Sequence, residues 1–331
     1  MEIKKNSISV ILPNYNGKDL MEMYIPFTLE ALKYSDVDFE FIVVDDCSTD
    51  DSAAFIRTNY PNFTLITNEV NKGFSYTCNR GMMVASKDLI LLLNTDVKLT
   101  LTYFENQFKY FDDPKAFGVM GCIMNFDNQK IEDAARFPAY KIAKFKANTF
   151  FYLEEETNSW TKTTYLSGAN ALVSREKIGF LNGFDEIYSP FYFEDFDLGL
   201  RAWKMGWNLY YDHGSICYHH VSSSTNKLNK SNFVQVTYNH NSFVLQAIHL
   251  NGIYRKIWYL QLYTVILFGH LLRGDFWILK SLKLFLKNCH EIKAARQKIK
   301  SLQAQLNVDF KLIHIIRTIR QSIAGKKVKW L

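Results

Sequence analysis

The sequence predicts an α/β fold with a mixed, mainly parallel sheet that carries helices on both faces, followed by a helical C-terminal extension. Over the first hundred residues, short runs of β-branched and apolar residues alternate with stretches of helical character. Such alternation is typical of a parallel sheet whose connections are helices. Hydrophobic residues make up 48% of the 331 residues, so the chain can bury a large core.

The elements of the first half can be assigned in order. The expected strands are Ile8–Leu12, Phe39–Val44, Phe63–Thr67 and Leu89–Leu93, and the expected helices are Asp19–Tyr34 and Gly73–Ala85. A further helix is expected to follow Ser48 to Asp51, because these residues suit a helix N-cap and an acidic first turn.

The second half is less regular. The expected elements are strands at Val119–Met124, Tyr165–Ser174, Trp207–Tyr211 and Ser215–Tyr218, and a helix at Glu194–Met205. Residues 125–160 have mixed charge and are expected to form a variable insertion, and from residue 232 the pattern is helical to the end. This change of pattern divides the chain into an α/β domain, residues 1–231, and a helical extension, residues 232–331.

Polar residues follow three of the expected strands, at the point where each strand ends. They are Pro13 and Asn14, Asp45 and Asp46, and Asn94, Thr95 and Asp96. In an open parallel sheet, ligands bind at the carboxyl ends of the strands. The sequence therefore predicts a single site at this edge.

Cysteine usage and the N-terminus indicate a reducing compartment. The five cysteines are widely spaced, and the sequence contains no C-x-x-C, so neither a disulfide framework nor a zinc ribbon is expected. The first residues lack the charged and apolar segments of a signal peptide. We therefore expect a cytoplasmic location.

Four segments of the chain resemble glycosyltransferase family 2. They are VILPNYNG (10–17), VVDDCSTDDS (43–52), NKGFSYTCNRGMMVASKDLILLLNTDV (71–97) and GFDEIYSPFYFEDFDLGLRAWKMGW (183–207). The resemblance covers about residues 7–224 and is strongest to bacterial rhamnosyltransferase-like members that build surface polysaccharide. It implies a Rossmann-like GT-A fold and an inverting transfer of sugar from a nucleotide-diphosphate donor to an acceptor hydroxyl.

The resemblance implies a metal site at Asp96. The family pattern at this position is Asp-x-Asp, and this chain has Asn94-Thr95-Asp96, so the first carboxylate is replaced by an amide. The last Asp would hold Mg²⁺ or Mn²⁺, with donor phosphates supplying further oxygens. His219 matches the family spacing His-x-x-x-x-Ser with Ser224 and is a second candidate ligand, although spacing alone separates it from His220.

The resemblance also assigns residues to the donor. Asp45 and Asp46 correspond to the acidic pair that binds the nucleotide, and Pro13, Asn14 and Tyr15 would shape the base pocket. The segment from Gly73 to Asn79, together with Asn94 and Thr95, would line the diphosphate side.

The motif Glu194-Asp195-Phe196-Asp197 is expected to supply the catalytic base. By resemblance this is Asp195, with Glu194 as the second candidate, and Asp197 is expected to orient either the start of the helix or a neighbouring ligand. The preceding run from Tyr188 to Phe193 is rich in aromatic residues, and an apolar environment would raise the pKa of a carboxyl group.

The C-terminal extension is predicted to bind the inner face of the cell membrane. Residues 251–331 carry 16 Lys/Arg against 3 Asp/Glu, in a chain whose net charge is +6. The apolar run Ile257–Leu272 is short for a membrane span, and the alternative for it is ordinary protein core. Phe276–Leu286 places lysines and leucines on different helical faces, a pattern typical of peripheral attachment. A lipid-linked saccharide acceptor would explain such attachment, and residues 291–331 could instead form a helical hairpin or a homo-oligomer contact.

Other functions remain as alternatives. A sugar nucleotidyltransferase would carry a Gly-rich basic loop after the first strand, where this chain has Pro13 to Lys18. A dehydrogenase would need G-x-G-x-x-G there. A non-catalytic nucleotide-sugar or membrane-binding module is the third alternative. The basic tail carries no nucleic-acid motif, so no nucleic-acid partner is expected.

Overall fold

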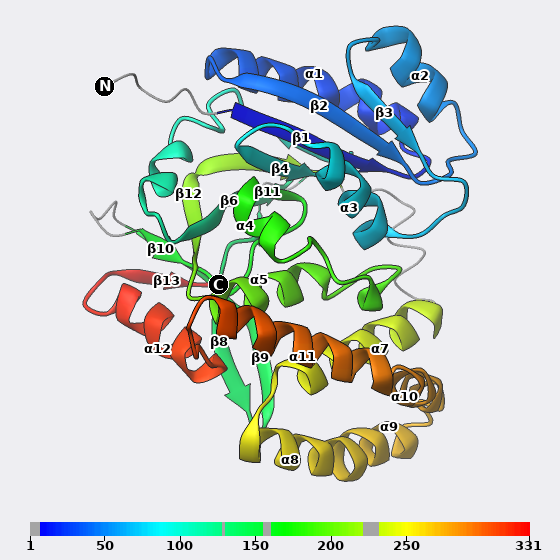
Figure 1. Ribbon diagram of the computed structural model, residues 1–331, viewed down its shortest axis with the longest axis vertical. Coiled ribbons are helices and arrows are strands. Elements are labelled where there is room, and N and C mark those ends of the chain that lie inside the picture. Colours follow the sequence, from blue (N-terminus) through cyan, green and yellow to red (C-terminus); the bar gives the residue numbers. More distant parts are fainter. Residues whose placement is uncertain (1–6, 128–129, 155–159, 221–231) are drawn as a thin grey trace.

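The computed structural model describes residues 7–127, 130–154, 160–220 and 232–331. It contains a large mixed sheet, a small antiparallel sheet and a group of C-terminal helices (Figure 1).

The large sheet has the strand order β10-β12-β6-β11-β4-β1-β2-β3, with β5 paired to β12 and β7 paired to β6. Its strands are β1 (Ser7–Asn14), β2 (Asp38–Asp45), β3 (Thr64–Thr67), β4 (Leu89–Leu93), β5 (Val97–Leu99), β6 (Ala116–Asn125), β7 (Ile131–Asp133), β10 (Thr161–Lys162), β11 (Asn170–Ser174) and β12 (Asn208–His219). Strands β1 to β4 are mutually parallel, and β11 runs antiparallel to both β4 and β6. The predicted mixed, mainly parallel sheet is therefore confirmed.

Helices join and cover these strands. They are α1 (Lys18–Tyr34), α2 (Ser52–Asn59), α3 (Phe74–Val84), α4 (Arg175–Phe180) and α5 (Glu194–Lys204), with short 3₁₀ helices at Phe108–Asp112 and Glu186–Tyr188. Helix α5 is buried along most of its length.

The insertion predicted at residues 125–160 is ordered β structure in its described part. After β7, strands β8 (Ala135–Lys141) and β9 (Lys144–Leu153) pair as an antiparallel hairpin. The chain end returns to this hairpin, because β13 (Val328–Trp330) pairs with β9. The expectation that the chain is helical to its end was therefore wrong, since a short C-terminal strand completes the small sheet.

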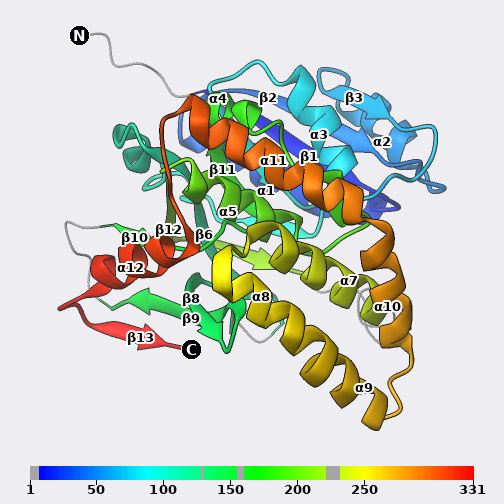
Figure 2. The same cartoon turned by 60° about the horizontal axis from the view of Figure 1, so that its bottom comes forward.

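The C-terminal helices pack against the α/β part and share its core. They are α7 (Asn232–His249), α8 (Gly252–Gln261), the π-helical turn η3 (Leu262–Leu267), α9 (Phe268–Leu272), α10 (Trp277–Lys287), α11 (Cys289–Gln305) and α12 (Leu312–Ile323). Residues of β1 and β4 belong to the same buried cluster as Phe243 of α7, Trp258 of α8 and Ile278 of α10. Figure 2 shows α7 beside α5, with α8 and α9 on the outer side.

Two local expectations needed correction. Trp207–Tyr211 and Ser215–Tyr218 are parts of one strand, β12, which is interrupted by a register shift between Asp212 and Ile216. Helix α2 begins after Asp51, which makes no side-chain capping bond. The Asp50 carboxylate instead accepts hydrogen bonds from the backbone N–H groups of Lys18 and Ser52, both at 3.1 Å, and so joins two loops.

Candidate active site

The carboxyl ends of β1 and β2 are held together by Asn14 and Asp45. Strand register places these two residues opposite each other, and Asn14 Nδ2 donates to Asp45 Oδ1 at 2.8 Å. Asp45 also accepts bonds from the backbone N–H and the hydroxyl of Ser48. The predicted base-pocket residues Pro13 and Tyr15 flank this pair, and Tyr15 is 55% exposed, so its ring is available to a ligand.

Asp46 points to a different part of the site. Its carboxylate accepts hydrogen bonds from Asn68 Nδ2 and from the backbone N–H groups of Lys72 and Gly73, at 2.8 to 2.9 Å. Gly73 has φ +85°, and a Cβ atom at this position would lie 2.8 Å from the backbone of Pro190. Asp46 and Gly73 thereby fix the loop that precedes α3 against the segment that leads into α5.

Asp96 and His219 meet at the end of β4. His219 Nε2 lies 3.2 Å from Asp96 Oδ2, and His219 Nδ1 lies 2.8 Å from Glu132 Oε2 of β7. The hydrogen bond with Asp96 raises the pKa of His219 to about 9. His220 faces away and pairs with the Tyr24 hydroxyl at 2.9 Å. The geometry therefore favours His219 over His220 as the partner of Asp96, and Ser224 lies outside the described residues.

This edge of the sheet has room for a cation and phosphate oxygens. Asp96 Oδ1 and Asn14 Oδ1 are both buried without a hydrogen-bond partner. Gly17 keeps the space beside them open, because a Cβ atom there would lie 2.5 Å from Asn14 Oδ1 and 3.3 Å from Thr95 Oγ1. Within the described ranges no group of three or more His, Cys, Asp or Glu side chains could hold a metal by itself. The residues present fit Mg²⁺ or Mn²⁺ whose remaining ligands come from a diphosphate.

The second half of the site is a cavity of about 430 Å³ beside Asp195. Its walls come from β8, β9, α5 and α7, and they carry Arg136, Asn148, Phe150, Tyr165, Tyr192, Glu194, Asp195 and Tyr238. Asp195 is half-buried, and its Oδ1 accepts a 2.6 Å hydrogen bond from the backbone N–H of Phe196. The cavity thus combines aromatic faces with a carboxylate.

The segment at Gly168 and Ala169 links the two halves. The Ala169 carbonyl accepts a bond from the Asn94 N–H at 3.2 Å, which anchors the loop that carries Asp96. The Gly168 amide lies close enough to Asp195 to lower the pKa of its carboxyl group. The donor edge and the cavity are therefore neighbours across one short segment.

Burial raises the pKa of the Asp195 carboxyl above its ordinary value, against the opposing effects of the Phe196 amide and the Arg136 charge. Burial and the neighbouring Asp195 raise the pKa of Glu194 as well. Glu194 Oε2 has no hydrogen-bond partner. Burial thus raises the pKa of Glu194 and of Asp195, as expected from the apolar surroundings, but not that of Asp197, and such a shift suits proton transfer near neutral pH.

A strained turn presents this motif to the cavity. Tyr192 and Phe193 both have φ +77°, a region that bulky residues rarely occupy. Asn241 of α7 holds the turn, because its Nδ2 lies within 2.6 to 3.0 Å of the carbonyl oxygens of Tyr188, Phe191 and Tyr192. The C-terminal extension therefore supports the position of Asp195.

Asp197 anchors α5 from its buried side. Its carboxylate bonds to Arg201 Nε at 2.6 Å, to His249 Nε2 at 2.8 Å and to the Tyr188 hydroxyl. Burial alone would raise the pKa of Asp197, but the Arg201 charge and the His249 hydrogen bond hold it well below its ordinary value. Asp197 thus orients the helix, in agreement with the expectation from sequence.

Some predicted residues bind other parts of the protein, and some site residues were missed. The amide of Asn79 bonds to the backbone of Phe184 and to Glu186, so it supports the loop before α5. Glu132 and Arg136 lie in the segment expected to vary, and Asn241 lies in the extension. Their roles depend on contacts between distant segments, and no local motif marks them.

The structure brings Asn14, Asp45 and Asp96 to the strand ends at one edge of an open α/β sheet, where ligands usually bind, and places a cavity lined by Asp195 nearby. The family model for glycosyl transferase family 2 matches residues 9–180, just over half of the chain. This chain therefore belongs to glycosyl transferase family 2.

Individual relatives are distant. A dolichyl N-acetyl-α-D-glucosaminyl phosphate 3-β-D-2,3-diacetamido-2,3-dideoxy-β-D-glucuronosyltransferase from Methanococcus voltae is 24% identical over 68% of this chain and 70% of its own length. An N-acetylglucosaminyl-diphospho-decaprenol L-rhamnosyltransferase from Mycobacterium tuberculosis is 26% identical over 56% of this chain and 68% of its own. The chain spans only about a third of the first curated relatives that it matches, 34% and 29% of their lengths.

A solved structure, GalNAc-T7 with UDP, GalNAc and Mn²⁺, matches with a TM-score of 0.65 at 13% identity, over 98% of this chain and 57% of the other. At this identity the match confirms the GT-A-like fold.

Proposed function

We propose that this enzyme moves a sugar, with inversion, from a nucleotide-diphosphate donor to a hydroxyl of a lipid-linked saccharide in surface-polysaccharide synthesis. The observation that carries the proposal is the position of Asp195. It is a carboxylate with a raised pKa, on the wall of a cavity that is separate from the donor edge but adjacent to it. Inversion requires a base on the side opposite the leaving group, and Asp195 would act as this base in the proposed mechanism.

In this proposal, residues at the sheet edge hold the donor. Asn14 and Asp45 bind the nucleoside, and Tyr15 offers an exposed ring to the base. Asp46 and Gly73 shape the adjoining loop, and Asn94 and Thr95 place Asp96. Asp96 and His219 would hold Mg²⁺ or Mn²⁺, which would neutralise charge on the diphosphate.

The cavity would take the acceptor. The Asp195 carboxylate accepts the proton of the attacking hydroxyl, and Glu194 is the alternative base. Arg136 lies with its guanidinium 3.9 Å from the centre of the Phe150 ring and pairs in bidentate fashion with Asp133. This pairing fixes the guanidinium, whose charge lowers the pKa of the Asp195 carboxyl group against the effect of burial.

We further propose that residues 1–231 carry catalysis and that residues 232–331 attach the enzyme to the inner face of the cytoplasmic membrane. No helix in the described part of the chain is long and apolar enough to cross a membrane. The exposed apolar side chains of α8 to α10 support peripheral attachment, and they include Leu260, Phe268, Leu272 and Phe276. The relatives whose names contain dolichyl and decaprenol substrates support a lipid-linked acceptor.

Calorimetric titration of the purified protein with nucleoside diphosphates and nucleotide sugars, with and without Mn²⁺ or Mg²⁺, tests the donor part of this proposal. Micromolar binding of one nucleotide, strengthened by metal, is expected and would name the base. If no nucleotide binds the folded protein in the presence of metal, the proposed donor site is wrong.

A further inference from the structure

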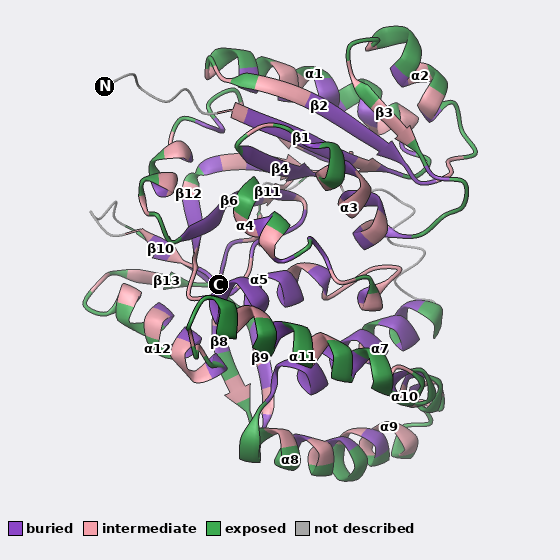
Figure 3. Cartoon of the chain, viewed as in Figure 1, coloured by how far each residue is buried: buried purple, intermediate pink, exposed green. Residues whose placement is uncertain are grey.

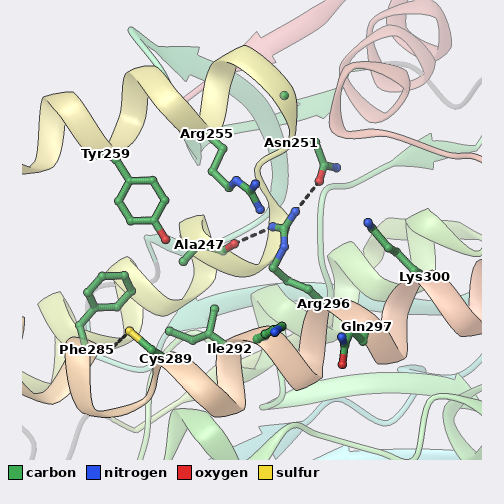
Figure 4. Close-up of a pocket in the computed structure, with 12 residues that line it drawn as sticks. Ala247, Asn251, Arg255, Tyr259, Phe285, Cys289, Ile292, Arg296, Gln297 and Lys300 are labelled. Carbon is green, nitrogen blue, oxygen red and sulfur yellow. Dashed lines mark hydrogen bonds between the residues drawn. The ribbon is translucent and has the colours of Figure 1, made fainter.

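A basic pocket lies between α8 and α11, on the outer side of the C-terminal helices (Figure 4). Its volume is about 540 Å³, and four of its lining residues are cationic: Arg255 of α8, and Lys293, Arg296 and Lys300 of α11. No Asp or Glu lines it. In Figure 4 the side chains of Arg255 and Tyr259 extend from α8 toward Arg296 on the facing helix.

Arg296 is fixed in place by neutral groups. Its Nη1 donates to the carbonyl oxygens of Ala247, Ile248 and Leu250 at 2.6 to 2.9 Å, and its Nη2 donates to Asn251 Oδ1. These contacts cap the end of α7 and account for the position of the guanidinium. They leave its positive charge without a carboxylate.

Hydrogen bonds to neutral groups explain the position of the Arg296 side chain but not the positions of Arg255, Lys293 and Lys300. Within the described ranges, no carboxylate forms an ion pair with Arg255, Lys293, Arg296 or Lys300. Burial and then the neighbouring charge of Arg255 lower the pKa of Arg296, so the two guanidinium groups repel each other. A bound anion would relieve this repulsion.

The chemistry of the cluster favours a phosphate group. Arginine forks match phosphate oxygens in bidentate geometry, and lysines add point charges around them. Arg255 and Arg296 are half-buried, whereas Lys293 and Lys300 are exposed, so the two arginines would interact with an anion more strongly because water screens them less. An isolated solvated helix face would scatter its charges, whereas these four converge on one cavity.

We propose that the pocket formed by Arg255, Lys293, Arg296 and Lys300 binds a phosphate group, at a site outside the donor and acceptor sites. The group could belong to an anionic lipid headgroup, which exposed apolar residues of the same helix would bring near, or to a soluble phosphate compound. Ile253, Ile257 and Leu260 are exposed on α8, the helix that carries Arg255. The proposal stands without any particular sugar donor or acceptor.

Two charge-matched variants of the full chain test the proposal. The pocket variant is Arg255→Gln/Lys293→Gln/Lys300→Gln, which keeps the helix-capping Arg296. The control is Lys280→Gln/Lys283→Gln/Lys287→Gln, which removes three exposed lysines of α10. Calorimetry with inorganic phosphate in the presence of EDTA keeps the metal-dependent donor site out of the measurement. Flotation with phosphatidylglycerol and phosphatidylcholine vesicles at about 150 mM salt tests the lipid source.

We expect the pocket variant, but not the control, to lose at least about tenfold in affinity for inorganic phosphate or for phosphatidylglycerol vesicles. The melting temperature of the pocket variant should be unchanged. A loss of phosphate affinity alone would assign the site to a soluble compound. A loss of phosphatidylglycerol-vesicle binding beyond that of the control would assign it to a headgroup. If both variants behave alike in both arms, the positive charge acts only diffusely and the proposal is overturned, whatever the outcome for nucleotide binding.

Discussion

At Asp195, burial raises the pKa of the carboxyl group, while the Phe196 amide and the Arg136 guanidinium lower it. The base must be ionised to accept a proton. Transfer is therefore expected to fall as the pH drops through this raised pKa, which places the acid limb above the usual range of an aspartate.

Replacement of Arg136 tests this balance. Arg136→Gln removes a positive charge near Asp195, so the acid limb of the kcat–pH profile should move to higher pH by roughly one unit. Arg136→Lys keeps the charge and should leave the limb nearly in place. A limb that stays fixed in Arg136→Gln, or moves to lower pH, would show that Asp195 does not control it.

Substitutions of Asp96 and of Glu132 should weaken the Mn²⁺ dependence of donor binding to different extents. Asp96→Ala removes the carboxylate with a free buried oxygen and should abolish the strengthening of donor binding by Mn²⁺. Glu132→Gln changes only the residue behind His219 and should weaken Mn²⁺ affinity about 10- to 100-fold. Titration calorimetry of both variants with the nucleotide measures this order, and an Asp96→Ala protein that keeps metal dependence would contradict it.

The sequence was most informative about site residues that directly follow a predicted strand. The sequence correctly placed Asn14, Asp45 and Asp96 at one edge of the sheet, because parallel strands bring their carboxyl ends together. Glu132 and Asn241 could not be found this way. Each acts on a residue 50 or more positions away, through contacts that only the tertiary fold creates.

At the scale of elements, helix α7 links the extension to the catalytic motif. Asn241 bonds to three carbonyl oxygens of the strained turn before α5, and His249 bonds to Asp197. The turn is held by a helix that sequence placed in a separate segment. We therefore expect substitutions in α7 to alter the position of Asp195 and the rate of transfer.

Asn241→Ala should destabilise the protein and slow transfer. It leaves the buried Tyr188 carbonyl and the partly buried carbonyls of Phe191 and Tyr192 without this donor, a change worth about 1–3 kcal/mol, and it frees the turn that holds Asp195. Asn239→Ala, on the exposed side of the same helix, is the matched control. Thermal unfolding and kcat together measure the effect, and an Asn241→Ala enzyme with the stability and kcat of the control would contradict it.

The strands of the first half were predicted well, because Leu89–Leu93 is a short, fully apolar run and the neighbouring strands are short, mostly apolar runs with clear ends. The antiparallel hairpin β8–β9 and strand β13 were not predicted. Their residues alternate with charges, and the pairing of β13 with β9 joins segments about 175 residues apart. Patterns within a short window carry no information about such a pairing.

At the scale of the whole molecule, exposed apolar residues gather on the outer helices. Leu272 and Phe276 are 73% and 67% exposed, at the turn between α9 and α10. Figure 3 shows how much of α8, α9 and α10 is exposed. In α10 the buried face is Ile278, Ser281 and Phe285, so Leu279 and Leu286 of the predicted apolar face point outward. This distribution favours contact with a lipid surface.

Phe268→Ser/Leu272→Ser should therefore weaken vesicle binding without unfolding the protein. Burial of each side chain in a bilayer contributes about 1.5–3 kcal/mol, so the double change should reduce partitioning at least tenfold. Val70→Ser/Met83→Ser removes two exposed apolar residues far along the chain and serves as the control. Equal partitioning of the two variants in a flotation assay would place the membrane contact elsewhere.

The most direct test of the account compares transfer and donor binding in Asp195→Asn, with Glu194→Gln beside it. Because the proposed base Asp195 would act on the acceptor and not on the donor, Asp195→Asn should lower transfer by about 10²- to 10⁴-fold and leave nucleotide-sugar affinity within about twofold of the unmodified enzyme. Near-normal transfer by Asp195→Asn, or its loss only in Glu194→Gln, would contradict the assignment of the base.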